Sequence, residues 1–195
     1  MLKLKDISIK YGKVSIIELL SYEFKSGNLY LLYGGNGTGK TTLLKLISGL
    51  IYKSEGFISI DREKIFYLPV NAAYPPYMKS HKYLEYINQF YKSPILNQLI
   101  QRYNLENKYI FQLSKGNKVK LGIIEGLIMN QDIYLFDEVL DGLDDSSKKE
   151  LKSDIRRLLD ENKLIIMATH ENGLYKDIKP IKLIIKDRNL HEKTK

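Results

Sequence analysis

The sequence contains no cysteine among its 195 residues. Disulfide bonds, zinc–thiolate sites and thiol catalysis are therefore excluded. The chain also lacks any run of the roughly 18 to 20 apolar residues that a membrane-spanning helix needs. Its longest apolar stretches, such as residues 164–168, have the length of a strand. Residues 1–6 alternate between apolar and charged side chains and lack the apolar core of a signal peptide. We expect a globular protein that stays inside the cell.

Charge is not concentrated in any one segment. The chain has 31 basic and 23 acidic residues, a net charge of +8, with lysines spread along its whole length. A positive chain is drawn to nucleotide phosphates, to nucleic acid or to anionic lipid headgroups. A solvated, lysine-rich surface explains the same balance. Charge alone therefore selects no function.

The chain has no internal repeat, low-complexity stretch or flexible linker, so we expect one domain over residues 1–195. Segments of strand length alternate with helical ones, which is typical of an α/β fold with a mainly parallel, covered sheet. The predicted strands span residues 2–9, 16–24, 29–33, 57–60, 65–68, 133–136, 164–168, 181–186 and 189–191.

Helical spacing of apolar residues appears in three places. One predicted helix buries a face formed by Leu43, Leu44, Ile47 and Leu50. Another spans residues 146–160. Residues from about 78 to 129 are mostly helical, with Ser93 and Pro94 as the cap and first residue of one helix. We expect this stretch to form an inserted arm beside a core of about residues 1–77 and 130–195.

Residues 34–42 carry a complete phosphate-binding motif, G-x-x-x-x-G-K-[ST], between a predicted strand and a predicted helix. Its members are Gly34, Gly35, Asn36, Gly37, Thr38, Gly39, Lys40, Thr41 and Thr42. Glycines let several backbone N–H groups point at one anion, and the helix start adds its positive dipole end. Lys40 would reach the β- and γ-phosphates, and the Thr41 hydroxyl would bind Mg²⁺. The motif predicts nucleotide binding.

The predicted strand at residues 133–136 ends in two adjacent carboxylates, Asp137 and Glu138. In a parallel sheet, ligands gather at the carboxyl ends of the strands. Asp137 would therefore face the metal held by Thr41. Glu138 would point towards the γ-phosphate and orient or deprotonate the attacking water.

These motifs resemble the ABC (ATP-binding cassette) ATPase family over nearly the whole chain. Residues 113–117, Leu-Ser-Lys-Gly-Asn, are similar to the family's LSGGQ signature, and Ser114 lies 74 residues after Lys40. Residues 141–144 are similar to its D-loop. The resemblance implies a P-loop NTPase fold with an N-terminal antiparallel β-subdomain and an inserted α-helical subdomain, and it implies ATP and Mg²⁺ as ligands.

The resemblance also assigns roles to single residues. His170 matches the family's switch histidine, which contacts the γ-phosphate, and Tyr11 matches the aromatic residue that stacks on adenine. Ser114 and Gly116 match the signature site, where a helix from about residue 118 would begin, and this site meets the γ-phosphate held by the opposite subunit. The family therefore implies a head-to-tail dimer with an identical or similar cassette.

Three positions depart from the family pattern. Val70 stands where the family usually has a glutamine that contacts Mg²⁺ and water, so we predict that Asn71 or a water takes that place. Lys115 and Asn117 replace a glycine and a glutamine of the signature. These changes leave open whether hydrolysis is slow.

In this family the motion of the dimer is passed to a separate transmembrane subunit, which docks between the core and the helical arm. Residues 74–77 and the helix at residues 83–91 are candidates for that surface, although their aromatic side chains would equally suit the arm's own core.

We expect an exporter-type transporter subunit, peripheral on the inner face of the cell membrane, with no nucleic acid partner. A soluble ABC ATPase and a non-hydrolysing nucleotide sensor are the alternatives.

Overall fold

The structure, a computed structural model, describes residues 2–60, 64–171 and 173–193. Its strands are β1 (Leu2–Tyr11), β2 (Val14–Phe24), β3 (Leu29–Tyr33), β4 (Glu55–Ser59), β5 (Ile65–Leu68), β6 (Ile133–Asp137), β7 (Leu164–Ala168), β8 (Ile181–Lys186) and β9 (Asn189–Glu192). Its helices are α1 (Lys40–Ser48), α2 (Ser80–Tyr91), α3 (Leu96–Arg102), α4 (Lys115–Met129) and α5 (Asp145–Asp160). Short 3₁₀ helices span Ile110–Gln112, Val139–Gly142 and Lys176–Ile178. No helix that the structure describes combines the length and the apolar character that crossing a bilayer requires.

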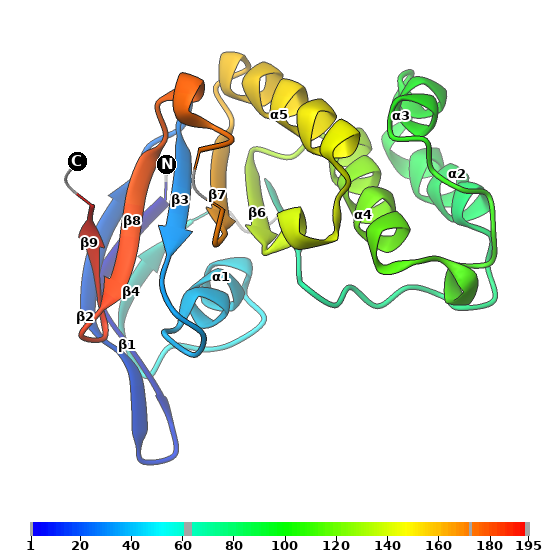
Figure 1. Ribbon diagram of the computed structural model, residues 1–195. Helices are drawn as coiled ribbons and strands as arrows, with labels where there is room; N and C mark the ends of the chain where they lie inside the picture. The colour runs from blue at the N-terminus through cyan, green and yellow to red at the C-terminus, as the bar shows by residue number, and fades with distance from the viewer. Residues whose placement is uncertain (1, 61–63, 172, 194–195) are drawn as a thin grey trace.

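A six-stranded sheet with the order β5-β6-β7-β3-β8-β9 forms the centre of the molecule (Figure 1). Its neighbouring strands are parallel, except that β9 pairs with β8 in the antiparallel direction. Every residue of β3, β6 and β7 is buried, as expected for strands that are covered on both faces. The predicted mainly parallel, covered sheet is therefore confirmed.

One face of the central sheet is covered by α1 and by a second, antiparallel sheet with the order β2-β1-β4. Because side chains alternate across a strand, Leu2, Leu4 and Leu20 point into this shared core. Leu44 and Ile47 of α1 complete it. The predicted N-terminal antiparallel β-subdomain is confirmed.

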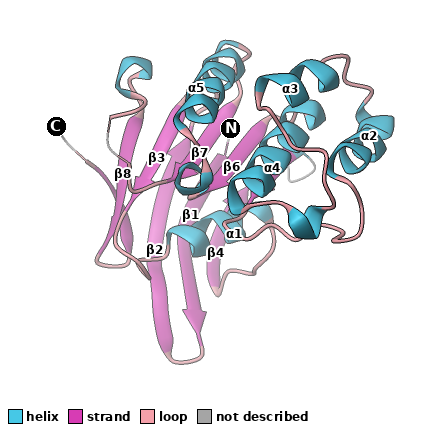
Figure 2. Ribbon diagram, turned by 45° about the vertical axis from the view of Figure 1, so that its right-hand side comes forward, coloured by secondary structure: helices cyan, strands magenta, loops and turns pink. Residues whose placement is uncertain are grey.

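The other face of the central sheet is covered by α4 and α5. Phe66, Phe136, Ile124 and Ile155 are among the side chains buried in this second core. Helices α2, α3 and α4 follow β5 in the chain, precede β6, and gather at one end of the molecule (Figure 2). The α-helical insertion into an α/β fold is thus present as expected.

Three sequence-based boundaries are wrong. Helix α1 ends at Ser48 because Gly49 adopts a left-handed conformation with φ 84°, and Leu50 is 65% exposed instead of buried on the helix. Ser93 does not cap α3, because that helix begins two residues after Pro94. The N–H of Ser93 donates instead to Oδ1 of Asn88.

The third error concerns α4. This helix begins at residue 115 rather than at about 118, directly after Ser114. The periodicity of apolar residues did not predict this start, because the first two helix residues are lysine and glycine and neither adds to an apolar face.

Candidate functional site

The loop between β3 and α1 is shaped by glycines that adopt left-handed conformations. Gly37 has φ 77° and Gly39 has φ 106°, values that other residues rarely adopt. At Gly39 space is restricted as well, since an added Cβ would lie 3.1 Å from Cγ2 of Ile16. The chain then enters α1 at Lys40, so the start of the helix faces the loop. This arrangement presents backbone N–H groups and the positive helix end to an anion.

A pocket of about 390 Å³ lies at this loop. It is lined by Ile16, Asn36, Gly37, Thr38, Gly39, Lys40, Thr41, Thr42 and Glu138. Most of the predicted phosphate loop and one of the two predicted carboxylates therefore line one pocket, although β3 and β6 are about a hundred residues apart in the chain.

Lys40 is 5% exposed, and its ammonium group is held by oxygen atoms. Its Nζ donates to the carbonyl oxygens of Gly34 (2.9 Å) and Gly35 (3.2 Å) and lies 3.7 Å from Oε1 of Glu138. A buried ammonium is tolerated only when such partners compensate its lost hydration. A phosphate in the pocket would supply the remaining negative charge.

Thr41 and Asp137 meet at the carboxyl end of β6. The Thr41 hydroxyl donates to Oδ1 of Asp137 at 3.1 Å, and Asp137 is fully buried. Burial raises the pKa of the Asp137 carboxyl, and hydrogen bonds from Thr41 and Tyr67 oppose that rise. Mg²⁺ prefers oxygen ligands and is usually held by one or two protein groups together with phosphate oxygens and water. Among the described residues no cluster of three acidic or histidine side chains competes for a metal. The pair therefore fits Mg²⁺ bound together with a nucleotide.

Tyr67 of β5 was not predicted as a site residue. Its hydroxyl donates to Oδ2 of Asp137 at 3.2 Å. The strand at residues 65–68 was predicted, but its pairing with β6 depends on strand register, which the sequence does not reveal.

Glu138 and His170 face one another across the ends of β6 and β7. Nε2 of His170 lies 3.1 Å from Oε1 of Glu138, and the Glu138 N–H donates to the carbonyl of Ala168 at 3.0 Å. Glu138 has φ 53°, a left-handed value that is uncommon outside glycine. A hydrogen bond between Lys148 and Glu171, the residue after His170, joins this loop to α5. A carboxylate and an imidazole thus lie together at the mouth of the pocket.

Ser114 and Gly116 lie at the start of α4 and outside the pocket lining. The Ser114 hydroxyl accepts the N–H of Asn117 at 3.2 Å and caps the helix. An added Cβ at Gly116 would lie 2.5 Å from the carbonyl oxygen of Gly142. The predicted signature and D-loop segments are therefore packed on each other, and the structure does not bring them to the phosphate loop of the same chain.

The family model for ABC transporters matches residues 17–141. The chain belongs to this family. It is 31% identical to an uncharacterized ABC transporter ATP-binding protein of Methanocaldococcus jannaschii, over 87% of this chain and 68% of that protein. It is also 31% identical to the cytochrome c biogenesis ATP-binding export protein CcmA of Reclinomonas americana, over 83% of this chain and 81% of that protein. The names of other relatives refer to import.

Solved structures of ABC proteins share the fold. The dimeric, post-hydrolysis structure of the ATP-binding cassette MJ0796, bound to ADP and phosphate, matches with a TM-score of 0.84. The match covers all of this chain and 98% of that chain, at 21% identity.

Two residues expected in the nucleotide site of this ABC protein are not among those that line the pocket at the phosphate loop. Tyr11, beside the turn between β1 and β2, is 51% exposed, and Ile16 rather than Tyr11 lines the pocket. Asn71 is exposed and lines a different pocket together with Lys115 and Lys118. The predicted roles of Tyr11 and Asn71 remain predictions.

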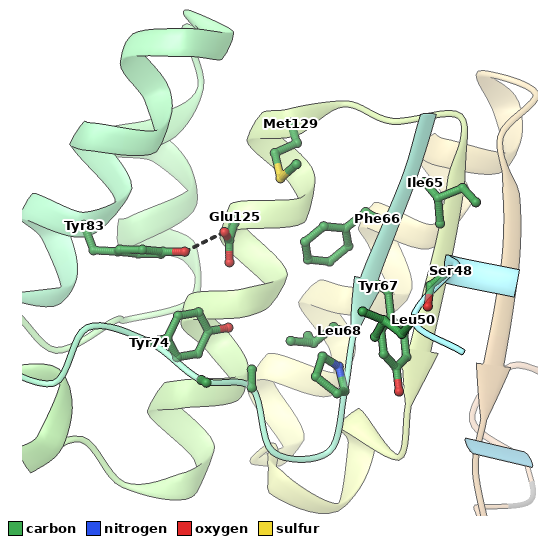
Figure 3. Close-up of a pocket in the computed structure, with 13 residues that line it drawn as sticks. Ser48, Leu50, Ile65, Phe66, Tyr67, Leu68, Tyr74, Tyr83, Glu125 and Met129 are labelled. Carbon is green, nitrogen blue, oxygen red and sulfur yellow. Dashed lines mark hydrogen bonds between the residues drawn. The ribbon is translucent and has the colours of Figure 1, made fainter. Parts of the chain in front are cut away.

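A groove of about 410 Å³ lies around β5, lined by residues of α2 and α4 on one side and by residues at the end of α1 on the other (Figure 3). Tyr74 and Tyr83 line it, with ring centroids 5.4 Å apart, whereas Tyr77, Tyr86 and Phe90 are exposed outside it. The aromatic residues of the arm are therefore divided between a groove and an outer surface.

The groove also contains a carboxylate. The Tyr83 hydroxyl donates to Oε1 of Glu125 at 2.6 Å. Burial raises the pKa of Glu125, and the hydrogen bond from Tyr83 acts in the opposite direction. The groove is thus mainly apolar, with one acidic group in its wall.

Proposed function

We propose that this chain is the ATP-hydrolysing subunit of an ABC transporter. The observation that carries this proposal is the pocket in which the phosphate loop, Lys40 and Glu138 come together beside the Thr41–Asp137 pair. Residues 34–42 bind the triphosphate through backbone N–H groups, and Lys40 binds the β- and γ-phosphates. Tyr11 stacks on the adenine when the nucleotide is bound.

Thr41 and Asp137 would hold Mg²⁺. Bound there, the ion would neutralise part of the charge of the β- and γ-phosphates. Asp137 contributes to this binding as a carboxylate that two hydroxyl groups already orient.

Glu138 orients the attacking water and accepts its proton. The water oxygen bonds to the γ-phosphorus, the bond from that phosphorus to the β–γ bridging oxygen breaks, and ADP leaves while inorganic phosphate forms. Nε2 of His170 lies 3.1 Å from Oε1 of Glu138, and the imidazole contacts the γ-phosphate when the nucleotide is bound. The ammonium of Lys40 stabilises the charge on the oxygens of the transferred phosphate.

Ser114 and Gly116 act on the nucleotide of a second cassette. They lie outside the pocket of their own chain, at a helix start whose N–H groups suit an anion. Two cassettes, identical or similar, therefore pair head to tail and enclose two ATP molecules, and hydrolysis reopens the pair. A cassette of the same fold, bound to ADP and phosphate, is dimeric, which supports the pairing of two cassettes.

The groove beside β5 and α4 receives a short helix of a separate transmembrane subunit, which locates the protein peripherally on the inner face of the cell membrane. Its apolar wall and single acidic group, Glu125, suit an amphipathic helix that brings a hydrogen-bond donor. We propose export as the direction, because Lys115 in the signature is shared with exporter-type cassettes and one relative is named for export.

The decisive experiment compares ATP hydrolysis by the wild type and by Glu138→Gln. The substitution keeps the shape of the side chain but removes the base, so we expect turnover to fall by about a hundredfold or more and ATP-dependent dimers to accumulate in size-exclusion chromatography. Glu161→Gln, at the far end of α5, is the control and keeps wild-type turnover. Equal turnover in Glu138→Gln contradicts the proposed role.

A non-hydrolysing nucleotide sensor is the second candidate, because Val70 replaces the usual glutamine and Asn71 does not line the pocket at the phosphate loop. Wild-type protein that binds Mg·ATP without turning it over would favour the sensor. Co-purification with a polytopic membrane protein separates the transporter subunit from a soluble ABC ATPase.

A further inference from the structure

Tyr67 lies between the nucleotide site and the groove. Strand β5 pairs with β6 in parallel, with Tyr67 opposite Leu135. Since side chains alternate along a strand, Leu135 and Asp137 share one face of the sheet. Tyr67 belongs to the same core as Leu135, whereas its neighbours Phe66 and Leu68 pack into the core on the other face. The strand register therefore directs the Tyr67 hydroxyl towards Asp137.

The hydroxyl completes the hydrogen bonding of a buried carboxylate. Asp137 accepts from Thr41 at Oδ1 and from Tyr67 at Oδ2, one donor on each oxygen. Two such bonds restrict rotation of the carboxylate plane. A buried carboxylate without the second donor would lose part of the interaction that compensates its desolvation.

The ring of Tyr67 also forms part of the groove wall. In Figure 3 Phe66 lies on the α4 side of β5, whereas Tyr67 lies beside Ser48 and Leu50, and all four line the groove. One half-buried side chain thus contacts the surface where a partner would dock and the carboxylate that would hold the metal.

We propose that Tyr67 is a positioning residue for Asp137, and that its hydroxyl sets the affinity of the site for the divalent cation. This inference rests on the proposed function, because Asp137 is a metal ligand only if the site binds Mg·ATP. Partners of metal ligands commonly change metal affinity by 10- to 100-fold when they are removed.

Tyr67→Phe tests the proposal, because it removes one oxygen atom and keeps the ring in the groove wall. The readout is binding of Mn²⁺, measured by electron paramagnetic resonance in the presence of a non-hydrolysable ATP analogue. Tyr22→Phe is the matched control: Tyr22 also donates to a carboxylate, Oε1 of Glu192 at 2.8 Å, and neither residue lines the pocket at the phosphate loop. Melting temperatures without metal are measured for both variants.

We expect Tyr67→Phe to need about tenfold more Mn²⁺ for half-saturation, while Tyr22→Phe matches the wild type and both variants melt at similar temperatures without metal. Unchanged Mn²⁺ binding in Tyr67→Phe would overturn the inference and leave the proposed function intact. A metal-free Tyr67→Phe that melts far below Tyr22→Phe would assign Tyr67 a structural role instead. If the wild type fails to bind the analogue at all, the proposed function fails, and this inference with it.

Discussion

Two helix starts in this chain are built to meet an anion, and they differ in how much of a site each provides. The start of α1 is preceded by left-handed glycines and carries the buried Lys40 beside Glu138. The start of α4 is capped by the Ser114 hydroxyl, which already accepts hydrogen bonds from Asn117, and Ser114 is not among the residues that line the pocket with Glu138.

This difference indicates that the site at the start of α1 is assembled within one chain, whereas the start of α4 supplies only half of a site. Around α1, Lys40 and Thr41 come from the start of the helix, and Asp137 and Glu138 come from the end of β6, so two distant segments of one fold supply the cation, the carboxylate and the proposed metal ligands. Around α4, the close contact of Gly116 with Gly142 fixes the helix start against the D-loop segment but supplies no catalytic group. Each cassette would thus bring a complete phosphate loop and a separate signature to a dimer.

The largest effect should come from Lys40→Ala, which tests whether the α1 site is complete in one chain. We expect the affinity for Mg·ATP to fall by at least about a hundredfold. The variant would lose the charge-assisted hydrogen bonds from Lys40 to the β- and γ-phosphates, each of roughly 1.5–3 kcal/mol. Calorimetry measures this loss. Lys45→Ala, on the same helix, is the control and should bind Mg·ATP as tightly as the wild type. If Lys40→Ala also binds Mg·ATP with wild-type affinity, the α1 site does not depend on Lys40 and its contrast with the α4 site is wrong.

Substitution of Ser114 should separate capping from catalysis at the α4 site. Ser114→Ala should lose about 1 kcal/mol of stability as a missing helix cap, keep its affinity for Mg·ATP, and hydrolyse ATP at least about tenfold more slowly. Ser114→Asn restores a cap without the hydroxyl.

Urea denaturation and steady-state hydrolysis together measure both properties. If Ser114→Asn regains turnover along with stability, Ser114 is a cap and nothing more, and the α4 start is not half of an active site.

The smallest effect concerns the ion pair that joins α4 to the start of α5. Lys120 lies 2.8 Å from Asp144, and the Lys120 ammonium, with hydrogen bonds from Ser146 and Ser147, holds the pKa of Asp144 well below its usual range. A carboxyl whose pKa is lowered by folding stabilises the protein above its unfolded pKa of about 4 and loses that contribution as the pH falls further.

Asp144→Asn should therefore cost about 1 kcal/mol or less at pH 7, because the carboxylate is half exposed and asparagine still caps α5. It should also flatten the fall in stability between about pH 4 and pH 2. Urea denaturation across this range measures the difference. If the free energy of unfolding falls equally with pH in the wild type and in Asp144→Asn, the Asp144 carboxyl is not the group that causes this loss of stability.

Local patterns placed the predicted phosphate loop and the two carboxylates between the right strands and helices, but they misplaced several element ends. The phosphate loop and the strand that ends in Asp137 depend on neighbours in the sequence. Leu50 was placed on α1 because its spacing is helical, but the left-handed turn at Gly49 ends the helix first. Ser93 resembled a helix cap because a proline follows it, but its N–H bonds to the Asn88 side chain instead.

By itself, the sequence determined the fold class, the phosphate loop and the two carboxylates after β6, because each rests on short-range pattern and on residue chemistry. Only the tertiary structure decided that Tyr67 bonds to Asp137 and that the groove beside β5 contains Glu125. These facts depend on strand register and on how helices pack across the sheet. Both are set by contacts between residues far apart in the chain, which no local pattern encodes.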